Sequence, residues 1–293
     1  MRVLVTGASG LVGSRLIKLL SSAGHTAIGL DRSGSELAVD MVNAAAFTDA
    51  LSAAKPDAII NCAAMTDVDG CEREPSAAWA VNAEAPATLA RYVRTHDCHL
   101  VHLSSDYVFD GDRGGYRPDD VPNPRGIYAI TKHGGEQAIR AVAPKERFAI
   151  ARPAVVYGWP AVAGKNNFGS WLVDALGSGK PVKLFSDQWV SPTHALNAAE
   201  MAAELATRRL PGIWHIAGAE VVDRVTFGHR LCERFGFDRA LVQPSRMADV
   251  NLPSPRPAKS GLDVSRTSES LTARPWSLEA ALDRLHAEVK GKS

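Results

Sequence analysis

The stretch "RVLVTGASGLVGSRLIKLL", residues 2–20, carries the first evidence about the fold. A short β-forming run leads into Gly7, Gly10 and Gly13, and an apolar pattern of helical period follows. Glycines allow a turn with positive φ and let the backbone approach a pyrophosphate closely. The helix that follows offers free N–H groups to such an anion. The stretch therefore predicts a dinucleotide-binding βαβ unit at the start of the chain.

The alternation of strand and helix continues through the first half of the chain. Pro86 lies inside a long alanine-rich helical pattern and must kink or break that helix. Strands that alternate with helices predict an α/β fold with a doubly wound (Rossmann) parallel sheet, covered on both faces. The predicted strands are 26–31, 56–64, 99–105 and 147–158, and the predicted helices are 11–24, 46–55, 75–97 and 128–143.

Proline and loop signals become more frequent after residue 158. We expect residues 1–158 to form the NAD(P)-binding Rossmann domain, with returning segments near 182–218. Residues 159–293 are expected to form mainly a smaller C-terminal substrate-binding lobe, in one compact body with a cleft between the two lobes. The helical patterns of this second part are 167–178, 194–208, 225–236 and 277–290.

Composition and charge narrow the class of protein. The 293 residues carry a formal net charge of +1, so they give no sign of a nucleic-acid partner. The cysteines form no CxxC pair and no metal-ligand spacing with histidines, which predicts free thiols and no metal site. The chain begins without a secretion signal, and no apolar run reaches the roughly 18 residues that a membrane span needs. We therefore expect a cytoplasmic protein with no membrane partner.

An acidic residue ends the second predicted strand. Asp31 is placed to accept hydrogen bonds from an adenine ribose, which favours NAD, whereas Arg32 or Arg15 could pair with the 2′-phosphate of NADP. The choice between NAD(H) and NADP(H) stays open. Asp40 is either a contact of the adenine end or a solvated loop carboxylate. The other candidate cofactor contacts are Ser9, Leu11, Val12, Met41, Cys62, Ala63 and Ala64.

The sequence "YAITK", residues 128–132, predicts a catalytic pair. Tyr128 and Lys132 are four residues apart, so they share one face of the predicted helix. A tyrosine hydroxyl with a pKa near ~10 is a poor acid at neutral pH, and a nearby ammonium lowers that pKa. Ser104 and Ser105 end the fourth predicted strand, at the edge of a parallel sheet where ligands bind, and either could hold a substrate carbonyl.

These motifs in this order resemble the extended short-chain dehydrogenase/reductase superfamily. Within it, "NCAAMTDVDGCE" (61–72) is similar to a segment of the dTDP-4-dehydrorhamnose reductases, and "LSSDYVFDG" (103–111) is similar to their S-T-D-Y-V-F-D-G signature. The segments "YAITKHGGE", "RPAVVYG", "KNNF", "DQWVSPT" and "RPAKSGLD" follow in family order, so the resemblance covers nearly the whole chain.

The resemblance implies an enzyme that uses NAD(P)H to reduce C4 of a nucleotide-linked 4-keto-6-deoxy sugar, a step of dTDP-rhamnose biosynthesis. Tyr128 would be the acid, Lys132 would tune it, and both would contact the cofactor, beside Asn61, Ala63 and Ala64. Asp106 and Tyr107 could instead cap a turn, and Arg152 could equally form a structural ion pair. The substrate candidates are Thr66, Val68, Ser105, Asp106, Tyr107 and Gln188, with Arg152, Pro192 and Thr193 in the substrate lobe.

The chain departs from the family pattern at two positions. Val155 stands where the family usually has a tryptophan that is expected to stack on the sugar, and Trp159 and Trp171 are nearby in sequence. Arg15 stands where some relatives have a glutamate of a magnesium site that joins two subunits, so no such metal site is expected.

Three further points stay open at this stage. The oligomeric state stays open, and a homodimer is one possibility. The chain also resembles the non-catalytic, NADP-binding regulatory β subunit of methionine adenosyltransferase through its "SSDYVFDG". A nucleotide-sugar epimerase or dehydratase is the other alternative.

Overall fold

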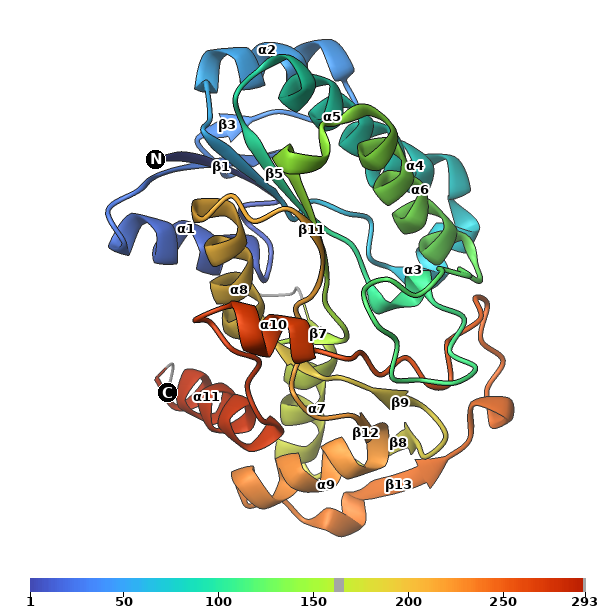
Figure 1. Ribbon diagram of the computed structural model, residues 1–293. Helices are drawn as coiled ribbons and strands as arrows, with labels where there is room; N and C mark the ends of the chain where they lie inside the picture. The colour runs from blue at the N-terminus through green and yellow to red at the C-terminus, as the bar shows by residue number, and fades with distance from the viewer. Residues whose placement is uncertain (161–165, 292–293) are drawn as a thin grey trace.

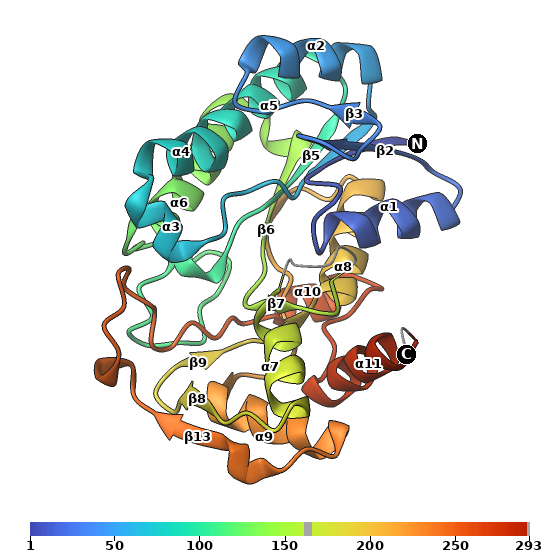
Figure 2. The same cartoon turned by 180° about the vertical axis from the view of Figure 1, so that it is seen from behind.

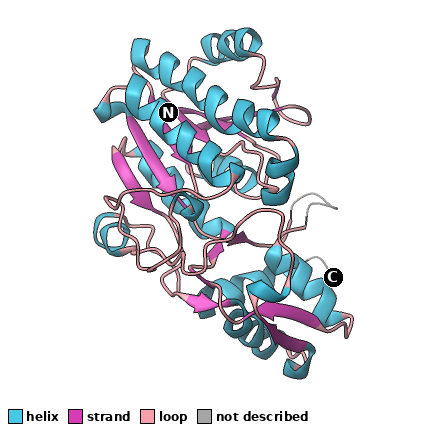
Figure 3. Ribbon diagram, turned by 90° about the vertical axis from the view of Figure 1, so that its right-hand side faces the viewer, coloured by secondary structure: helices cyan, strands magenta, loops and turns pink. Residues whose placement is uncertain are grey.

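The computed structural model describes residues 1–160 and 166–291 (Figure 1). A large sheet with its helices forms the upper part in this view, and smaller strand pairs with further helices form the lower part. The same division is visible from behind (Figure 2). In the side view, helices lie along the large sheet and long loops cross the middle of the molecule (Figure 3).

The large sheet has seven strands, and every neighbouring pair in it is parallel. Because the chain leaves β1 toward β2 and later returns on the other side at β4, the strand order reverses at β1. Ligands of open α/β sheets bind at the carboxyl ends of the strands beside such a switch point. The order is β11 (Gly212–His215), β6 (Phe148–Arg152), β5 (His99–Leu103), β4 (Ala58–Asn61), β1 (Arg2–Thr6), β2 (Thr26–Asp31) and β3 (Leu37–Ala38).

Helices cover both faces of this sheet. On one face, α1 (Gly13–Ser22) and α8 (Ala195–Thr207) bury leucines and alanines against β1, β4 and β5. On the other face, α2 (Ala44–Ala54), α5 (Ala85–Thr95) and α6 (Ile127–Val142) bury a second apolar layer. The predicted doubly wound parallel sheet is therefore confirmed.

The helical stretch around Pro86 is broken, as predicted. It consists of α4 (Pro75–Trp79), a π-helical turn at Ala80–Glu84, and α5. Proline has no N–H to donate to the carbonyl of Asn82 four residues earlier, so the α-helical pattern cannot continue through this point. That carbonyl faces α6, where a Cβ on Gly135 would come within 2.3 Å of it. Glycine at 135 thus allows the two helices to approach closely.

The lower part of the molecule has its own apolar core, built mainly from three helices and the strands beside them.

The predicted strand 147–158 is in fact two strands: β6 ends at Arg152, before Pro153, and β7 pairs with β10 and not with the large sheet. Near 182–218, α8 and β11 lie on the large sheet, whereas β8 pairs with β13. The helices are α7 (Phe168–Gly177), α9 (Arg224–Phe235), α10 (Ser265–Ser270) and α11 (Leu278–Lys290). The strand pairs are β7 (Val156–Tyr157) with β10 (Thr193–His194), β8 (Val182–Phe185) with β13 (Val242–Ser245), and β9 (Trp189–Val190) with β12 (Val222–Asp223).

A buried ion pair fastens α6 to β6. The Arg152 guanidinium donates to both carboxylate oxygens of Glu136 at 2.8 and 2.7 Å, and both side chains are 0% exposed. Burial raises the pKa of Glu136, but the hydrogen bonds and charge of Arg152 outweigh it and hold that pKa well below its ordinary value. Arg152 also lies over the Phe109 ring. The interpretation of Arg152 as a substrate contact is therefore wrong, and the alternative of a structural ion pair holds.

We predict that Arg152→Met lowers the free energy of unfolding by about 3–5 kcal/mol, because Glu136 would be left as an unpaired buried charge. Urea denaturation followed by circular dichroism measures this change. The exposed Arg94, in the last turn of α5, is a matched control, and Arg94→Met should change the free energy by about 0.5 kcal/mol or less. Equal effects of the two substitutions would contradict a structural role for the pair.

Candidate active site

The glycine turn after β1 is closely packed against the loop that follows β4. Gly7 has φ +64°, and a Cβ on it would lie 2.9 Å from the Ala63 nitrogen. A Cβ on Gly13 would come within 2.2 Å of the Gly7 carbonyl oxygen. Val12 stands at the N-cap of α1, and no side chain caps this helix. The N–H groups of Ser14 and Arg15 already donate to the Gly10 and Val12 carbonyls, but no side chain blocks the positive end of the α1 dipole, which fits the pyrophosphate of a dinucleotide.

Asp31 is fixed beside this turn. Its Oδ2 accepts hydrogen bonds from the Ser9 N–H at 3.1 Å and the Ser9 hydroxyl at 2.6 Å, and its Oδ1 accepts from the Arg32 N–H at 2.8 Å. The Arg32 side chain is exposed. Asp31 thus lies where a ribose of the cofactor would pass, close to the glycine turn.

Two further cofactor candidates lie at the start of α2. Asp40 is exposed, and its carboxylate accepts a hydrogen bond from the Val42 N–H at 3.1 Å, as a loop aspartate commonly does. Met41 is buried, and it lines a small pocket together with Thr88 and Arg91 of α5. Of Asp40 and Met41, only Met41 has an apolar side chain against which an adenine ring could pack.

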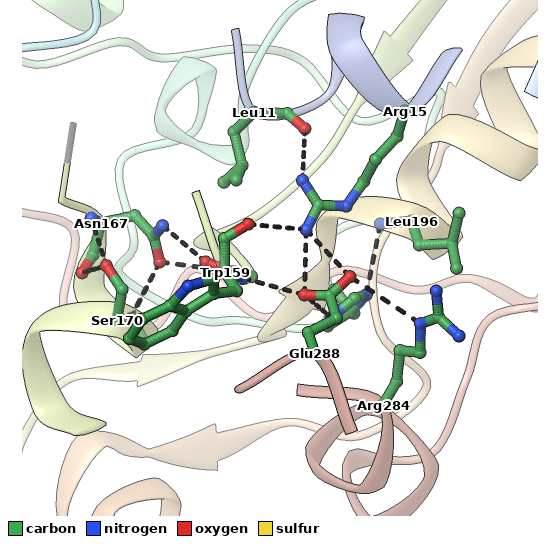
Figure 4. Close-up of polar contacts among 11 residues, drawn as sticks. Leu11, Arg15, Trp159, Asn167, Ser170, Leu196, Arg284 and Glu288 are labelled. Atoms are coloured by element: carbon green, nitrogen blue, oxygen red, sulfur yellow. Dashed lines mark hydrogen bonds and ion pairs between the residues drawn. The ribbon is translucent and has the colours of Figure 1, made fainter. Parts of the chain in front are cut away.

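The Arg15 side chain contacts residues that are far away in the sequence (Figure 4). Its guanidinium donates to the Leu11 carbonyl at 2.8 Å, to the Trp159 carbonyl at 2.9 Å and to both carboxylate oxygens of Glu288 at 2.9 Å. Burial raises the pKa of Glu288, but bonds from His194 and the Trp159 N–H, with the nearby positive charge, lower it to about 2. Long-range partners thus occupy the Arg15 side chain and join α1 to α11, and its pairing with a 2′-phosphate of NADP stays a prediction.

The loop after β4 is held in place by polar side chains from three strands. The Thr6 hydroxyl donates to Asn61 Oδ1 at 2.5 Å, and Asn61 Nδ2 donates to His102 Nδ1 at 2.8 Å. The Ala63 N–H donates back to the Thr6 hydroxyl at 3.3 Å. Cys62, in the same loop, has its pKa raised by burial to about 12 and stays a neutral thiol. The chain from Asn61 to Ala64 therefore lies against the glycine turn, where the cofactor candidates of this loop were expected.

Lys132 is buried under the end of β5. Its ammonium donates to the carbonyl of Leu103, the last residue of that strand, at 2.7 Å, and the side chain is 1% exposed. Burial lowers the pKa of Lys132 to about 8, while Glu136 acts in the opposite direction. The bond fixes the middle of α6 to the carboxyl edge of the sheet.

Tyr128 lies one turn earlier on α6 and is 9% exposed. Burial raises its pKa, and the contact with the Ser105 hydroxyl acts in the opposite direction. We predicted that Lys132 lowers the pKa of Tyr128. In the protein without a cofactor this pKa is raised instead, because desolvation of the phenolate outweighs the favourable contact. At neutral pH the tyrosine is protonated, which is the state of a proton donor.

Ser105, Asp106 and Tyr107 surround Tyr128. The Ser105 hydroxyl donates to Asp106 Oδ1 at 3.1 Å and accepts from the Tyr107 N–H at 3.2 Å, so Ser105 caps the 3-10 turn Asp106–Val108. Asp106 is 2% exposed, and burial raises its pKa to about 6. The ring of Tyr107 meets the ring of Tyr128 edge to face, with 5.5 Å between centroids. The residues that we predicted on two different elements therefore meet in one place.

Arg224 joins this cluster from α9, and the sequence reasoning missed it. Its Nε donates to Gln188 Oε1 at 3.0 Å, and its guanidinium lies 4.4 Å over the Phe168 ring. Burial lowers the pKa of Arg224, whereas Tyr107 and Asp106 raise it. Within the described residues, its Nη1 is buried without a hydrogen-bond partner. The sequence does contain one signal for it. Arg224 is the first residue of α9, where a positive charge opposes the helix dipole and therefore needs another reason to be there.

The other substrate candidates lie in different surroundings. Thr66 is exposed, and Val68 begins α3 (Val68–Arg73), packing against the cluster that contains Tyr128. Thr193 is fully buried, donates to the Ala154 carbonyl at 2.7 Å and accepts from the Gly218 N–H at 3.2 Å. The Thr193 hydroxyl thus joins two backbone segments.

The position of the missing tryptophan is strained. Val155 has φ +40°, which is rare for a β-branched residue. Trp159 uses its backbone to bind Glu288 and Arg15, and Trp171 is exposed on α7.

Across residues 1–160 and 166–291, no group of three or more His, Cys, Asp or Glu side chains could hold a metal ion. In the same described part, no helix is both long enough and apolar enough to span a bilayer.

The seven-stranded parallel sheet, the helices on both of its faces and the glycine turn define the fold of the extended short-chain dehydrogenases/reductases. A family model described as the RmlD substrate binding domain matches residues 1–290, and the chain belongs to this family. The predicted fold, family and enzyme class are thereby confirmed.

Comparisons with individual proteins agree with this family. The chain is 37% identical to the probable low-salt glycan biosynthesis reductase Agl14 of Haloferax volcanii, over 98% of both chains. It is 36% identical to the dTDP-4-dehydrorhamnose reductase of Mycobacterium tuberculosis, over 94% of this chain and 86% of that one. The crystal structure of the dTDP-4-dehydrorhamnose reductase from Bacillus anthracis, in complex with NADP, superposes with a TM-score of 0.88. The two are 26% identical, over 98% of this chain and 99% of that one.

We predict that Asp106 makes stability fall as pH rises. Its pKa is raised from 3.8 to about 6 in the folded protein, so the folded state binds the proton more tightly than the unfolded state. The free energy of unfolding should therefore decrease between pH ~4 and ~6, by about 3 kcal/mol at most from this group. Urea titrations of wild type and Asp106→Asn measure it, and parallel pH curves for the two proteins would contradict the raised pKa.

Proposed function

We propose that this protein uses NADPH or NADH to reduce the C4 keto group of a 4-keto-6-deoxy sugar carried on a nucleoside diphosphate. The observation that carries the proposal is the meeting of Ser105, Asp106 and Tyr107 around Tyr128, at the carboxyl edge of the sheet. The relatives named dTDP-4-dehydrorhamnose reductase support this choice of substrate.

The cofactor would lie across the carboxyl ends of β1, β2 and β4. The glycine turn and the N terminus of α1 would hold its pyrophosphate, and Asp31 would accept hydrogen bonds from its adenine ribose. The loop from Asn61 to Ala64 would line its nicotinamide half. Reduced nicotinamide supplies the hydride of the reaction when it is bound.

Tyr128 would give the proton that the substrate oxygen needs. Tyr128 is protonated at neutral pH, and Ser105, which is close enough to affect its pKa, would hold the same carbonyl. Lys132, with a pKa of about 8, is mostly an ammonium at neutral pH and would stabilise the phenolate that proton transfer leaves. Burial of these groups would exclude water from the reacting atoms.

Arg224 would bind an anionic oxygen of the nucleotide diphosphate. The guanidinium is held from one side by Gln188 and from beneath by Phe168, so its Nη1, which has no hydrogen-bond partner among residues 1–160 and 166–291, is presented in a fixed direction. A buried guanidinium without an anion is costly, and a phosphate oxygen would supply the missing partner. Gln188 would thus act on the substrate through Arg224.

Replacing Tyr128 with phenylalanine should lower kcat by about 100-fold or more, which is the range of a lost general acid. Cofactor binding and fold should survive, because only a hydroxyl is removed. The assay mixes purified protein with dTDP-4-dehydrorhamnose and follows the absorbance of NADPH and NADH in parallel. Tyr92→Phe, a buried tyrosine in the α5 layer, is the matched control.

Unchanged turnover in Tyr128→Phe would rule out Tyr128 as the acid. Cofactor binding by wild type without any oxidation would favour a regulatory subunit instead. Product formation without net cofactor consumption would indicate an epimerase or dehydratase.

Arg224→Lys should raise the KM for the nucleotide sugar about 10-fold or more, because lysine keeps the charge but cannot reach two partners at once. We expect kcat to change little and cofactor affinity to stay the same. Arg230→Lys, on the same helix and paired with Glu220 at its surface, serves as the control. If both variants keep the wild-type KM, Arg224 does not contact the substrate.

A further inference from the structure

One carboxylate oxygen of Glu72 joins two segments that are far apart in sequence. Glu72 lies on α3, and its Oε1 accepts a hydrogen bond from the Ile127 N–H at 2.8 Å and another from the Ser254 hydroxyl at 2.8 Å. Ile127 is the first residue of α6, and Tyr128 follows it directly. The proposed proton donor is therefore one residue away from this junction.

The N terminus of α6 has no cap of its own. Gly126 stands at the N-cap and makes no side-chain cap bond. A Cβ on Gly126, at φ +84°, would lie 2.6 Å from the Ser254 hydroxyl oxygen and 2.9 Å from Glu72 Oε1. Glycine is thus required for the three segments to meet. Glu72 supplies the missing acceptor from another helix and places a negative charge at the positive end of α6.

Ser254 begins a segment, 254–262, that runs along the substrate side of the site. Its Pro257 carbonyl accepts from Gln188 Nε2 at 3.4 Å, and Ser260 is close enough to lower the pKa of Asp106. Figures 1 and 2 both show the orange-to-red chain of this region rising toward α3.

An ion pair also joins the same segment to α3. The Arg256 guanidinium donates to Asp69 Oδ1 at 2.8 Å, and the Ser254 N–H donates to the same oxygen at 3.3 Å. Arg256 also acts on the site itself, since its charge lowers the pKa of Tyr107 against the effect of burial. The segment 254–262 therefore has contacts with α3 at one end and with substrate-side residues along its length.

We propose that Glu72 is a positioning residue, whose carboxylate fixes the start of α6, and hence Tyr128, relative to the segment 254–262. It connects the group that donates the proton to the side chains that hold the substrate. This inference rests on the proposed function, in which Tyr128 is the acid. Its structural part, the junction of α6 with the segment 254–262 through Glu72, is testable without turnover.

The test compares Glu72→Ala with Glu72→Gln, Ser254→Ala and the double variant Glu72→Ala/Ser254→Ala. Glu74→Ala is the control, because Glu74 is exposed on the same stretch and makes no side-chain cap bond. Amide hydrogen exchange of residues 127–131 and of 254–262 is measured by mass spectrometry. Keto-sugar reduction is measured on the same samples, with the KM of the reduced cofactor determined separately.

Glu72→Ala should speed exchange in both segments and lower kcat about 10-fold or more, since a displacement of about 1 Å at a reacting group can cost 100-fold. The cofactor KM should stay the same. Glu72→Gln should restore most of kcat, because its amide oxygen accepts both bonds. Adding Ser254→Ala to Glu72→Ala should change little more, since both act through one junction.

Unchanged exchange at 127–131 in Glu72→Ala would overturn the proposal. A lower melting temperature with unchanged kcat for the folded protein would reduce Glu72 to a structural role and overturn it as well. If wild type reduces no keto-sugar, the proposed function fails, and the exchange data still decide whether Glu72 forms the junction.

Discussion

The bond from the Lys132 ammonium to the Leu103 carbonyl is the contact on which the rest of the site depends. A buried lysine needs a partner, and this one finds it at the last residue of β5. Tyr128 and Glu136 lie four residues before and after Lys132 on α6, so the same face carries the proposed acid and the carboxylate that pairs with Arg152. Lys132 and Glu136 thereby hold α6 against the carboxyl ends of β5 and β6.

Local patterns in the sequence predicted this framework, because each depends on neighbours along the chain. The glycine turn, the strand–helix alternation and the Tyr128–Lys132 spacing are of this kind. The partners of Arg15, Arg152 and Thr193 could not be predicted from the sequence, because tertiary packing brings Glu288, Glu136 and the backbone near Ala154 and Gly218 to them. Arg224 was missed for the same reason. A charged side chain in a sequence does not reveal whether another charge already satisfies it.

Burial also explains why the electrostatics differ from the expectation. An ammonium near a phenol lowers the pKa of that phenol, but in this fold desolvation acts on both groups and shifts each toward its neutral form. Tyr128 is consequently a protonated donor, whereas Lys132, with a pKa of about 8, is still mostly an ammonium at neutral pH. Asp106 follows the same rule, because burial raises its pKa to about 6. Such a site suits an uncharged carbonyl, with Arg224 left to meet an anion.

The most direct test of this account follows the hydride itself. Purified protein is incubated with dTDP-4-dehydrorhamnose and reduced cofactor deuterated at C4 of the nicotinamide ring, and the sugar product is examined by NMR. The account predicts deuterium on C4 of the hexose, in proportion to the cofactor oxidised. A bound cofactor that keeps all of its deuterium, or deuterium at another carbon of the sugar, would contradict it.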